Sequence, residues 1–282
     1  MSSFKRVSRR LSDMFSQKSS QKASEDSPKS SDPTLAGGDS DEAINNRSDQ
    51  LLDPRKLNIP AKHCEMFKAV NLAVMNYMYG PAFDASHDYE HIQRVVSLAY
   101  KIYEEHKDDH WAHDIDRTVM YVACMVHDVG DAKYHVREVN DERDQEDIVR
   151  DFLKANGCKD PRVYAPASYV AARVSFSREL NDPEEIQKEV EICPALRIVQ
   201  DADRLEGLGA IGIGRCFVFG GINEGRRKDT IHTGVELHYN RFQKYLELMK
   251  TETGREMAKE RLEVMDKFRK HWFEETDCSS VL

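Results

Sequence analysis

Two histidines and two aspartates lie on predicted helix faces that are otherwise apolar. They are His91, the adjacent pair His127 and Asp128, and Asp203. The apolar residues at helical spacing are Val95, Leu98 and Ile102 for His91, Ala123 and Met120 for His127, and Val199 and Leu196 for Asp203. Burying a carboxylate among apolar side chains is costly unless another group compensates its charge. These four residues are therefore candidates for one shared site.

The four side chains offer nitrogen and oxygen donors, a mixture that suits Mn²⁺, Fe²⁺, Mg²⁺ or Zn²⁺. The segments that carry them are far apart in the sequence and meet only through the fold. Spacing alone therefore also allows each of them to be an ordinary hydrogen-bonded polar residue of the core. Asp201 has Arg197 and Arg204 at helical spacing, so we expect it to form an ordinary ion pair at the surface.

The elements that must position these residues are predicted to be helices from about residue 56 onward. Apolar residues recur every three or four positions between breakers such as Gly80-Pro81, Asp160-Pro161 and Asp182-Pro183. Neither strand–helix alternation nor an internal repeat is present. The sequence predicts an all-α protein, with a single domain of about eight to ten helices over residues 56–275 and a short C-terminal tail over 276–282. Residues 252–275 are predicted to form one long, charged helix.

Residues 1–55 differ in composition from the rest of the chain. They are rich in serine, basic at first and acidic afterwards, and too poor in apolar residues to offset the entropy lost on folding. We expect a disordered tail. Phe4, Val7 and Leu11 recur at helical spacing among arginines, which also allows a short amphipathic helix that contacts a membrane surface or directs the chain to an organelle.

Composition argues against several classes of protein. The net charge of −9 disfavours binding to duplex nucleic acid, and no stretch approaches the ~18 apolar residues of a membrane span. The six cysteines lack CxxC spacing and follow no secretory signal, so we expect neither a zinc–cysteine cluster nor disulfides. We expect a cytoplasmic protein, with nuclear or organellar targeting by the basic tail left open. Assembly into a homo-oligomer also stays open.

The segments around the four candidate ligands resemble the H…HD…D pattern of the HD-domain superfamily. His91 lies in HIQRV, His127 and Asp128 in ACMVHDVGD, and Asp203 in DADRL. The segments SHDYEHIQRVVSLA, QDADRLEGLGAIGIGRCFVFGG and LMKTETGREMAKER are similar to small HD hydrolases, which include Mn²⁺-dependent nucleotide pyrophosphohydrolases. The resemblance covers residues 63–275. It implies one divalent ion, Mn²⁺ before Mg²⁺, Fe²⁺, Co²⁺ or Zn²⁺, bound by His91, His127, Asp128 and Asp203.

The resemblance also implies a phosphohydrolase in which an ion-activated water attacks a phosphate ester or anhydride, most simply that of a nucleotide. Asp128 would serve the ion, and Asp131 would act as general base, although Asp131 would equally suit a loop-capping role. Candidates for contacting the anionic substrate are His87, Arg94, Lys133 and Arg204, which lie beside the ligand motifs.

Two other functions remain open at this point. One is an HD-fold protein that binds nucleotide or serves as a scaffold without catalysis. The other is a di-iron HD oxygenase, which needs additional histidines between the HD pair and the last aspartate. Only His135 lies between Asp128 and Asp203, and this shortage favours a single metal and hydrolysis.

Overall fold

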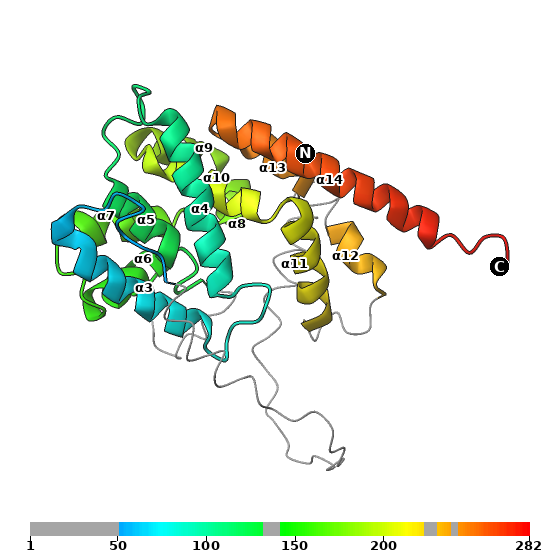
Figure 1. The fold of residues 1–282 in the computed structure, drawn as a ribbon, viewed down its shortest axis with the longest axis horizontal. Coiled ribbons are helices and arrows are strands. Elements are labelled where there is room, and N and C mark those ends of the chain that lie inside the picture. The colour runs from blue at the N-terminus through cyan, green and yellow to red at the C-terminus, as the bar shows by residue number, and fades with distance from the viewer. Residues whose placement is uncertain (1–50, 132–141, 223–229, 238–241) are drawn as a thin grey trace, which may run out of the picture. The chain divides into compact units, whose positions relative to one another are not determined.

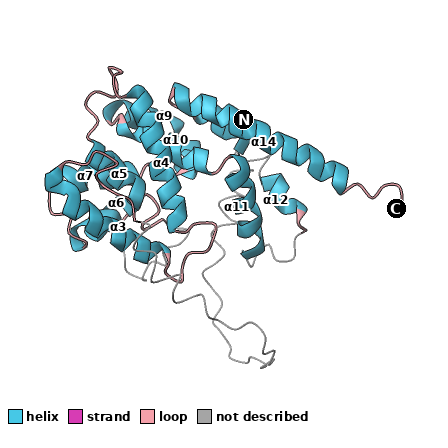
Figure 2. Ribbon diagram, viewed as in Figure 1, coloured by secondary structure: helices cyan, strands magenta, loops and turns pink. Residues whose placement is uncertain are grey.

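The computed structural model describes residues 51–131, 142–222, 230–237 and 242–282. Within these ranges the chain is helical and contains no strand (Figure 2), so the predicted all-α class is confirmed. The first half of the domain contains a 3₁₀ turn and five helices: η2 (Ala61–His63), α3 (Cys64–Met78), α4 (Tyr89–His106), α5 (Arg117–Val126), α6 (Gln145–Ala155) and α7 (Pro161–Ala171).

The second half of the domain contains shorter helices followed by one long helix. Their bounds are α8 (Phe176–Asn181), α9 (Pro183–Ile192), α10 (Ala195–Glu206), α11 (Gly209–Ile222), α12 (His232–Leu237), α13 (Gln243–Leu248) and α14 (Glu252–Glu275). The twelve α-helices of the described residues exceed the predicted eight to ten. Helix α14 has the bounds that were expected for the long charged helix.

Aspartates preceding the helices explain where several of them begin. Asp88, Asp116 and Asp144 accept backbone N–H groups in the first turns of α4, α5 and α6. Asp160 and Asp182 do the same for α7 and α9, each of which has proline as its first residue. Such residues satisfy N–H groups that have no partner within the helix, and proline loses nothing at the first position.

Helix α10 lies at the centre of the packing (Figure 1). It contacts α4, α5, α7, α9, α11 and α14, while α11 packs against both α12 and α14. The core combines buried residues of α4, such as Ile92, Val95 and Ala99, with Leu196, Val199 and other residues of α10. Leu51 and Leu52, which precede the expected boundary at residue 56, pack against this core.

Asp201 joins α10 to the start of α14, and the expectation of a surface ion pair is wrong. The side chain is fully buried. It accepts the backbone N–H of Lys250 at 2.9 Å, the backbone N–H of Thr251 at 2.8 Å and the Thr251 hydroxyl at 2.8 Å. Thr251 is the N-cap of α14. Asp201 therefore fixes the position of α14 on α10.

Candidate metal centre

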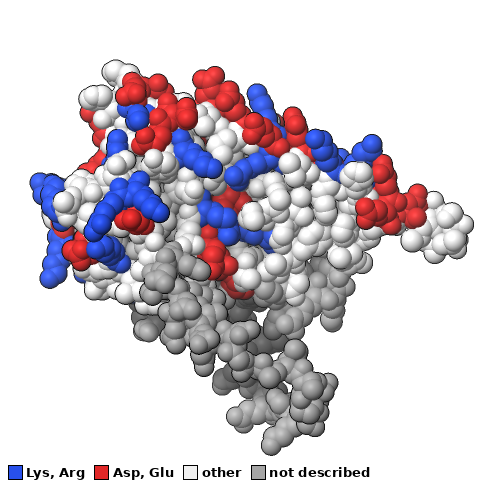
Figure 3. Space-filling model, viewed as in Figure 1, with Lys and Arg blue, Asp and Glu red and all other residues white. Residues whose placement is uncertain are grey.

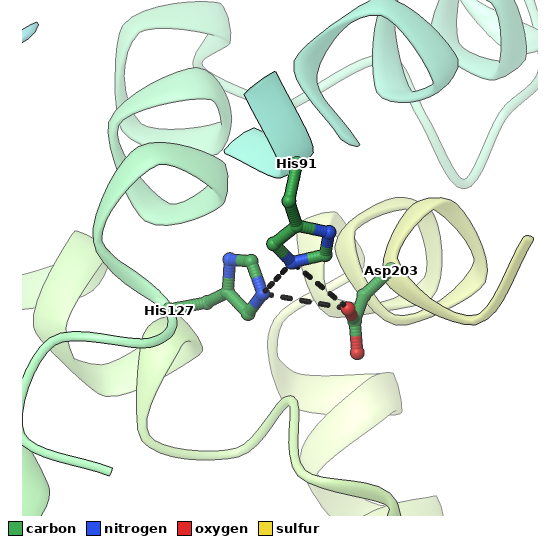
Figure 4. A group of neighbouring side chains, drawn as sticks. All are labelled: His91, His127 and Asp203. Atoms are coloured by element: carbon green, nitrogen blue, oxygen red, sulfur yellow. Dashed lines mark hydrogen bonds and ion pairs between the residues drawn. The ribbon is translucent and has the colours of Figure 1, made fainter. Parts of the chain in front are cut away.

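The four candidate ligands lie at the ends of three helices. His91 is in the first turn of α4, where its backbone N–H binds Asp88 Oδ1 at 2.9 Å. His127 and Asp128 directly follow α5, and Asp203 is in the last turn of α10. Figure 4 shows the side chains of His91, His127 and Asp203 pointing toward one another from these separate elements.

The ligand atoms lie at distances suited to a shared ion. Nε2 of His91 is 3.3 Å from Nε2 of His127, and Oδ1 of Asp203 is 3.7 Å and 3.4 Å from these two nitrogens. Asp128 lies 3.4 Å from His91 Nε2 through Oδ2 and 3.5 Å from His127 Nε2 through Oδ1. Donors that bind one ion at about 2.1 Å are about 3.0–3.4 Å apart, so only small adjustments are needed.

The second nitrogen of each histidine faces an acceptor. His127 Nδ1 lies 2.8 Å from the backbone oxygen of Cys124, and His91 Nδ1 lies 2.9 Å from Glu206 Oε2. An acceptor at Nδ1 retains the proton there and leaves the lone pair on Nε2, as in histidines that bind metals. Both Nε2 atoms are thus suited to bind the same cation.

Asp128 adds an observation that favours a cation at this position. Its Oδ2 atom is buried and has no hydrogen-bond partner among the described residues. Buried polar atoms are rarely left in this state, and an ion is one recognised explanation. The donor set of two imidazoles and two carboxylates therefore fits a divalent metal.

Charges within the metal-free cluster shift the pKa values of its members in opposite directions. Burial, together with the charge of Arg215, lowers the pKa of His91 to about 4. Burial also disfavours a charged His127, but Asp128 and Asp203 outweigh it and raise the pKa of His127 to about 9. Burial alone would raise the pKa of Asp203. The hydrogen bond to His127 and the charge of His127 together have the larger, opposite effect, so the pKa of Asp203 lies below its ordinary value.

The turn after α5 is shaped by Gly130. Its φ of +70° is a left-handed conformation, and an added Cβ would lie 2.7 Å from Ile148 Cγ2. The Gly130 N–H donates to the Tyr77 hydroxyl at 3.3 Å, and Gln145 Nε2 donates to the backbone oxygen of His127 at 2.8 Å. Asp131 follows in the same turn, with its backbone N–H 3.3 Å from the Asp128 oxygen. The turn therefore presents His127, Asp128 and Asp131 on a fixed backbone.

Glu206 and Arg215 also belong to this site, and the sequence analysis did not identify them. Glu206 is buried in the last turn of α10, and its Oε2 forms an ion pair with Arg215 of α11. Its Oε1 accepts Arg94 Nε at 2.8 Å. The spacing of three residues from Asp203 places Glu206 on the same helix face and could have indicated it, whereas no local pattern indicates Arg215.

The predicted substrate residues have different surroundings. The ring of His87 lies 5.9 Å from that of His91 and 6.4 Å from that of Phe219. Arg94 retains 36% of its side-chain exposure while bound to Glu206. Arg204, however, is buried, donates to the Leu248 oxygen and forms an ion pair with Glu179, so its guanidinium has a structural role. Lys133 lies outside the described residues.

Charged side chains of both signs gather between α4 and α11 in the middle of the face seen in Figure 3, while much of the surrounding face is uncharged. Across the described residues, none of the helices combines the length and apolar character needed to cross a membrane.

Comparisons with known proteins agree with this geometry. The family model of the HD domain matches residues 88–208, which include all four candidate ligands. The uncharacterized protein YpgQ of Bacillus subtilis is 30% identical over 190 residues, covering 65% of this chain and 82% of YpgQ.

Solved structures share the fold. The crystal structure of Bacillus subtilis YpgQ in complex with ADP has a TM-score of 0.53 at 24% identity, covering 73% of this chain and 97% of that one. A Lactobacillus plantarum protein has a TM-score of 0.56 at 22% identity, covering 75% of this chain and 96% of that one. An HD-superfamily hydrolase from Bacillus thuringiensis has a TM-score of 0.50 at 23% identity, covering 75% of this chain and 96% of that one.

Proposed function

The chain belongs to the HD-domain superfamily, and we propose that it is a metal-dependent phosphohydrolase that acts on a nucleotide. The observation that carries this proposal is the convergence of His91, His127, Asp128 and Asp203, with both histidine Nδ1 atoms facing acceptors. Nucleotide as the substrate class is supported by the structure of YpgQ in complex with ADP, since YpgQ has the same fold. We propose Mn²⁺ as the ion.

The ion and the protein would have separate tasks. When bound, a divalent ion polarises a water molecule and offsets the negative charge that develops on the phosphoryl oxygens. The four ligands would hold it at the meeting point of α4, α5 and α10, with Asp128 and Asp203 supplying the negative charge. The buried histidines would exclude bulk water from one side of the reacting centre.

We assign the transfer of the water proton to Asp131. It lies three residues after Asp128 in the turn fixed by Gly130, so its position relative to the ligands is set by the same backbone. A carboxylate in this place can accept a proton as the water attacks phosphorus. The alternative is that Asp131 stabilises only the turn.

Arg94 and His87 are the described side chains best placed to contact phosphate oxygens. The Nε atom of Arg94 is fixed by Glu206, and its Nη2 lies 4.0 Å from Asp88 Oδ1, a long contact that a phosphate oxygen would have to compete with at the exposed part of the guanidinium. His87 Nδ1 lies 2.8 Å from the Ser86 hydroxyl, which limits the orientation of its ring next to His91. Lys133 stays a candidate from the sequence.

The test is to supply purified, Mn²⁺-loaded protein with a panel of phosphate esters and nucleotides and to measure released phosphate and pyrophosphate. Asp131→Asn, which removes basicity at nearly constant volume, should retain metal and substrate binding and lower kcat about 10²–10⁴-fold. If Asp131 only stabilises the turn, the variant will instead lose thermal stability with kcat intact. ADP binding without turnover of any compound would favour the non-catalytic alternative.

A further inference from the structure

Glu206 is a buried carboxylate of α10 with partners from two other helices, α4 and α11. Only 1% of its side chain is exposed. Oε2 lies 2.9 Å from His91 Nδ1 of α4 and pairs with Arg215 of α11, while Oε1 accepts Arg94 Nε of α4. One arginine would balance the charge of the Glu206 carboxylate. The presence of both Arg94 and Arg215 therefore needs an explanation other than charge balance.

Arg215 connects α11 to both sides of the metal centre. Its Nε donates to the backbone oxygen of Ser86 at 2.6 Å, just before α4, and its Nη1 pairs with Glu206 of α10. The same Nη1 lies 3.2 Å from His91 Nδ1. The residue therefore spans the gap between the segment before His91 and the carboxylate behind it.

The start of α11 is fitted closely to the end of α10. A Cβ at Gly212 would lie 2.1 Å from the backbone oxygen of Gly207, so only glycine allows this approach. Arg215 is three residues after Gly212 and hence on the same helix face. The close contact at Gly212 brings the Arg215 guanidinium within reach of Glu206. Arg215 lies beyond residues 88–208, the stretch that the HD family model matches.

We propose that Glu206 and Arg215 are positioning residues that orient His91 for metal binding and fix α11 against the metal centre. The identity of the ion in this proposal rests on the proposed function, whereas the orientation of the His91 ring does not. The Glu206 carboxylate lies nearer to Nδ1, at 2.9 Å, than the competing donor Arg215 Nη1, at 3.2 Å, so in this proposal its charge favours a proton on Nδ1 and leaves Nε2 to face His127 and Asp203. Arg215 holds the Glu206 carboxylate in place and secures the backbone that leads into α4.

The test compares two buried glutamates of similar surroundings. Glu206→Gln removes the charge behind His91, whereas Glu179→Gln removes a charge that is paired with Arg204 and Lys250. Both variants should lose thermal stability. Only Glu206→Gln should weaken Mn²⁺ binding, measured by calorimetry, and about 10–100-fold is expected for a residue that orients a ligand.

A second pair of variants tests the arginine independently. Arg215→Met should weaken Mn²⁺ binding, and Arg215→Lys should weaken it less, because a lysine can still pair with Glu206 but cannot also reach the Ser86 oxygen. Arg173→Met is the control, since Arg173 has a similarly small exposure, 13% against 16%, and pairs with Glu146 and Glu189 rather than with Glu206. Its Mn²⁺ affinity should match that of the unchanged protein.

Nitrogen NMR of His91 in the metal-free protein gives a readout that does not depend on the ion. The unchanged protein should carry the neutral ring proton on Nδ1, and Glu206→Gln and Arg215→Met should give a mixture of both tautomers. Unchanged tautomer and unchanged Mn²⁺ affinity in both variants would overturn the positioning role. Absence of Mn²⁺ binding by the unchanged protein would refute the proposed function instead, and the tautomer result would still decide the role of Glu206.

Discussion

Replacing each aspartate of the segment DADRL by alanine should affect a different property of the protein. Asp201→Ala should lower the free energy of unfolding, and Asp203→Ala should weaken metal binding. Asp201 is fully buried and accepts three hydrogen bonds from Lys250 and Thr251. Asp201→Ala leaves those donors without an acceptor, at about 1–1.5 kcal/mol each, so the free energy of unfolding should fall by about 3–5 kcal/mol. For a domain of this size that corresponds to a loss of about 6–20 °C in Tm.

Asp203 should contribute less to stability than Asp201 and much to metal binding. Its side chain is 27% exposed, and in the metal-free protein it pairs with the charged His127 and lies 3.7 Å from the neutral His91. Asp203→Ala should lower the free energy of unfolding by less than Asp201→Ala does, because Asp128 still pairs with His127 and the repulsion between the two carboxylates is relieved. Loss of a direct ligand should weaken Mn²⁺ binding by more than the roughly 100-fold upper range of residues that only orient a ligand.

The assay combines urea unfolding in the presence of a chelator with Mn²⁺ titration of each variant at a temperature where it is folded. Asp201→Ala should bind Mn²⁺ normally once folded, and Asp203→Ala should be the less destabilised variant but should lose Mn²⁺ binding. If Asp201→Ala lowers Mn²⁺ affinity as strongly as Asp203→Ala and leaves unfolding unchanged, the assignment of the ligand within DADRL is wrong.

Three further results are expected. Because the pKa of His127 is about 9, a metal ion that binds near neutral pH must displace one proton from its ring. The Mn²⁺ affinity should therefore rise about tenfold per pH unit between pH 6.5 and 8. Equal heats of Mn²⁺ binding in buffers of different ionisation enthalpy would contradict this. Gly130→Ala places a Cβ against Ile148 at positive φ and should cost about 2–4 kcal/mol in urea unfolding, and a smaller loss would show that the turn adjusts. Removal of residues 1–50 should leave Tm nearly unchanged, and a large decrease would show that this segment docks.

The helix pattern allowed much of the fold to be predicted because most helices bury one face. Apolar spacing and the proline breakers indicated the all-α class, and the charged residues from Glu252 indicated α14 with its observed bounds. The number of helices was underestimated because α8, α12 and α13 are only six residues long, too short for a repeating apolar pattern to be evident.

The same reasoning failed on α10 for a physical reason. This helix is buried on nearly every side, so it has no solvent-facing side to which Asp201 could be assigned. Arg197 and Arg204 stand at the spacing of ion-pair partners, but Arg204 binds Glu179 instead. Arg215 could not be linked to His91 from the sequence, because the two residues meet only through the packing of α11 on α10.

The placement of the ligands at the ends of α4, α5 and α10 has a consequence for the lifetime of the folded chain. An ion bound there would act as a cross-link between residues 91, 127 and 203, closing two long loops of the polypeptide. Unfolding that separates α10 from α4 would then first require release of the ion, so the rate of unfolding should depend on metal concentration. Proteolysis in a chelator should accordingly be faster than in Mn²⁺, independently of any substrate.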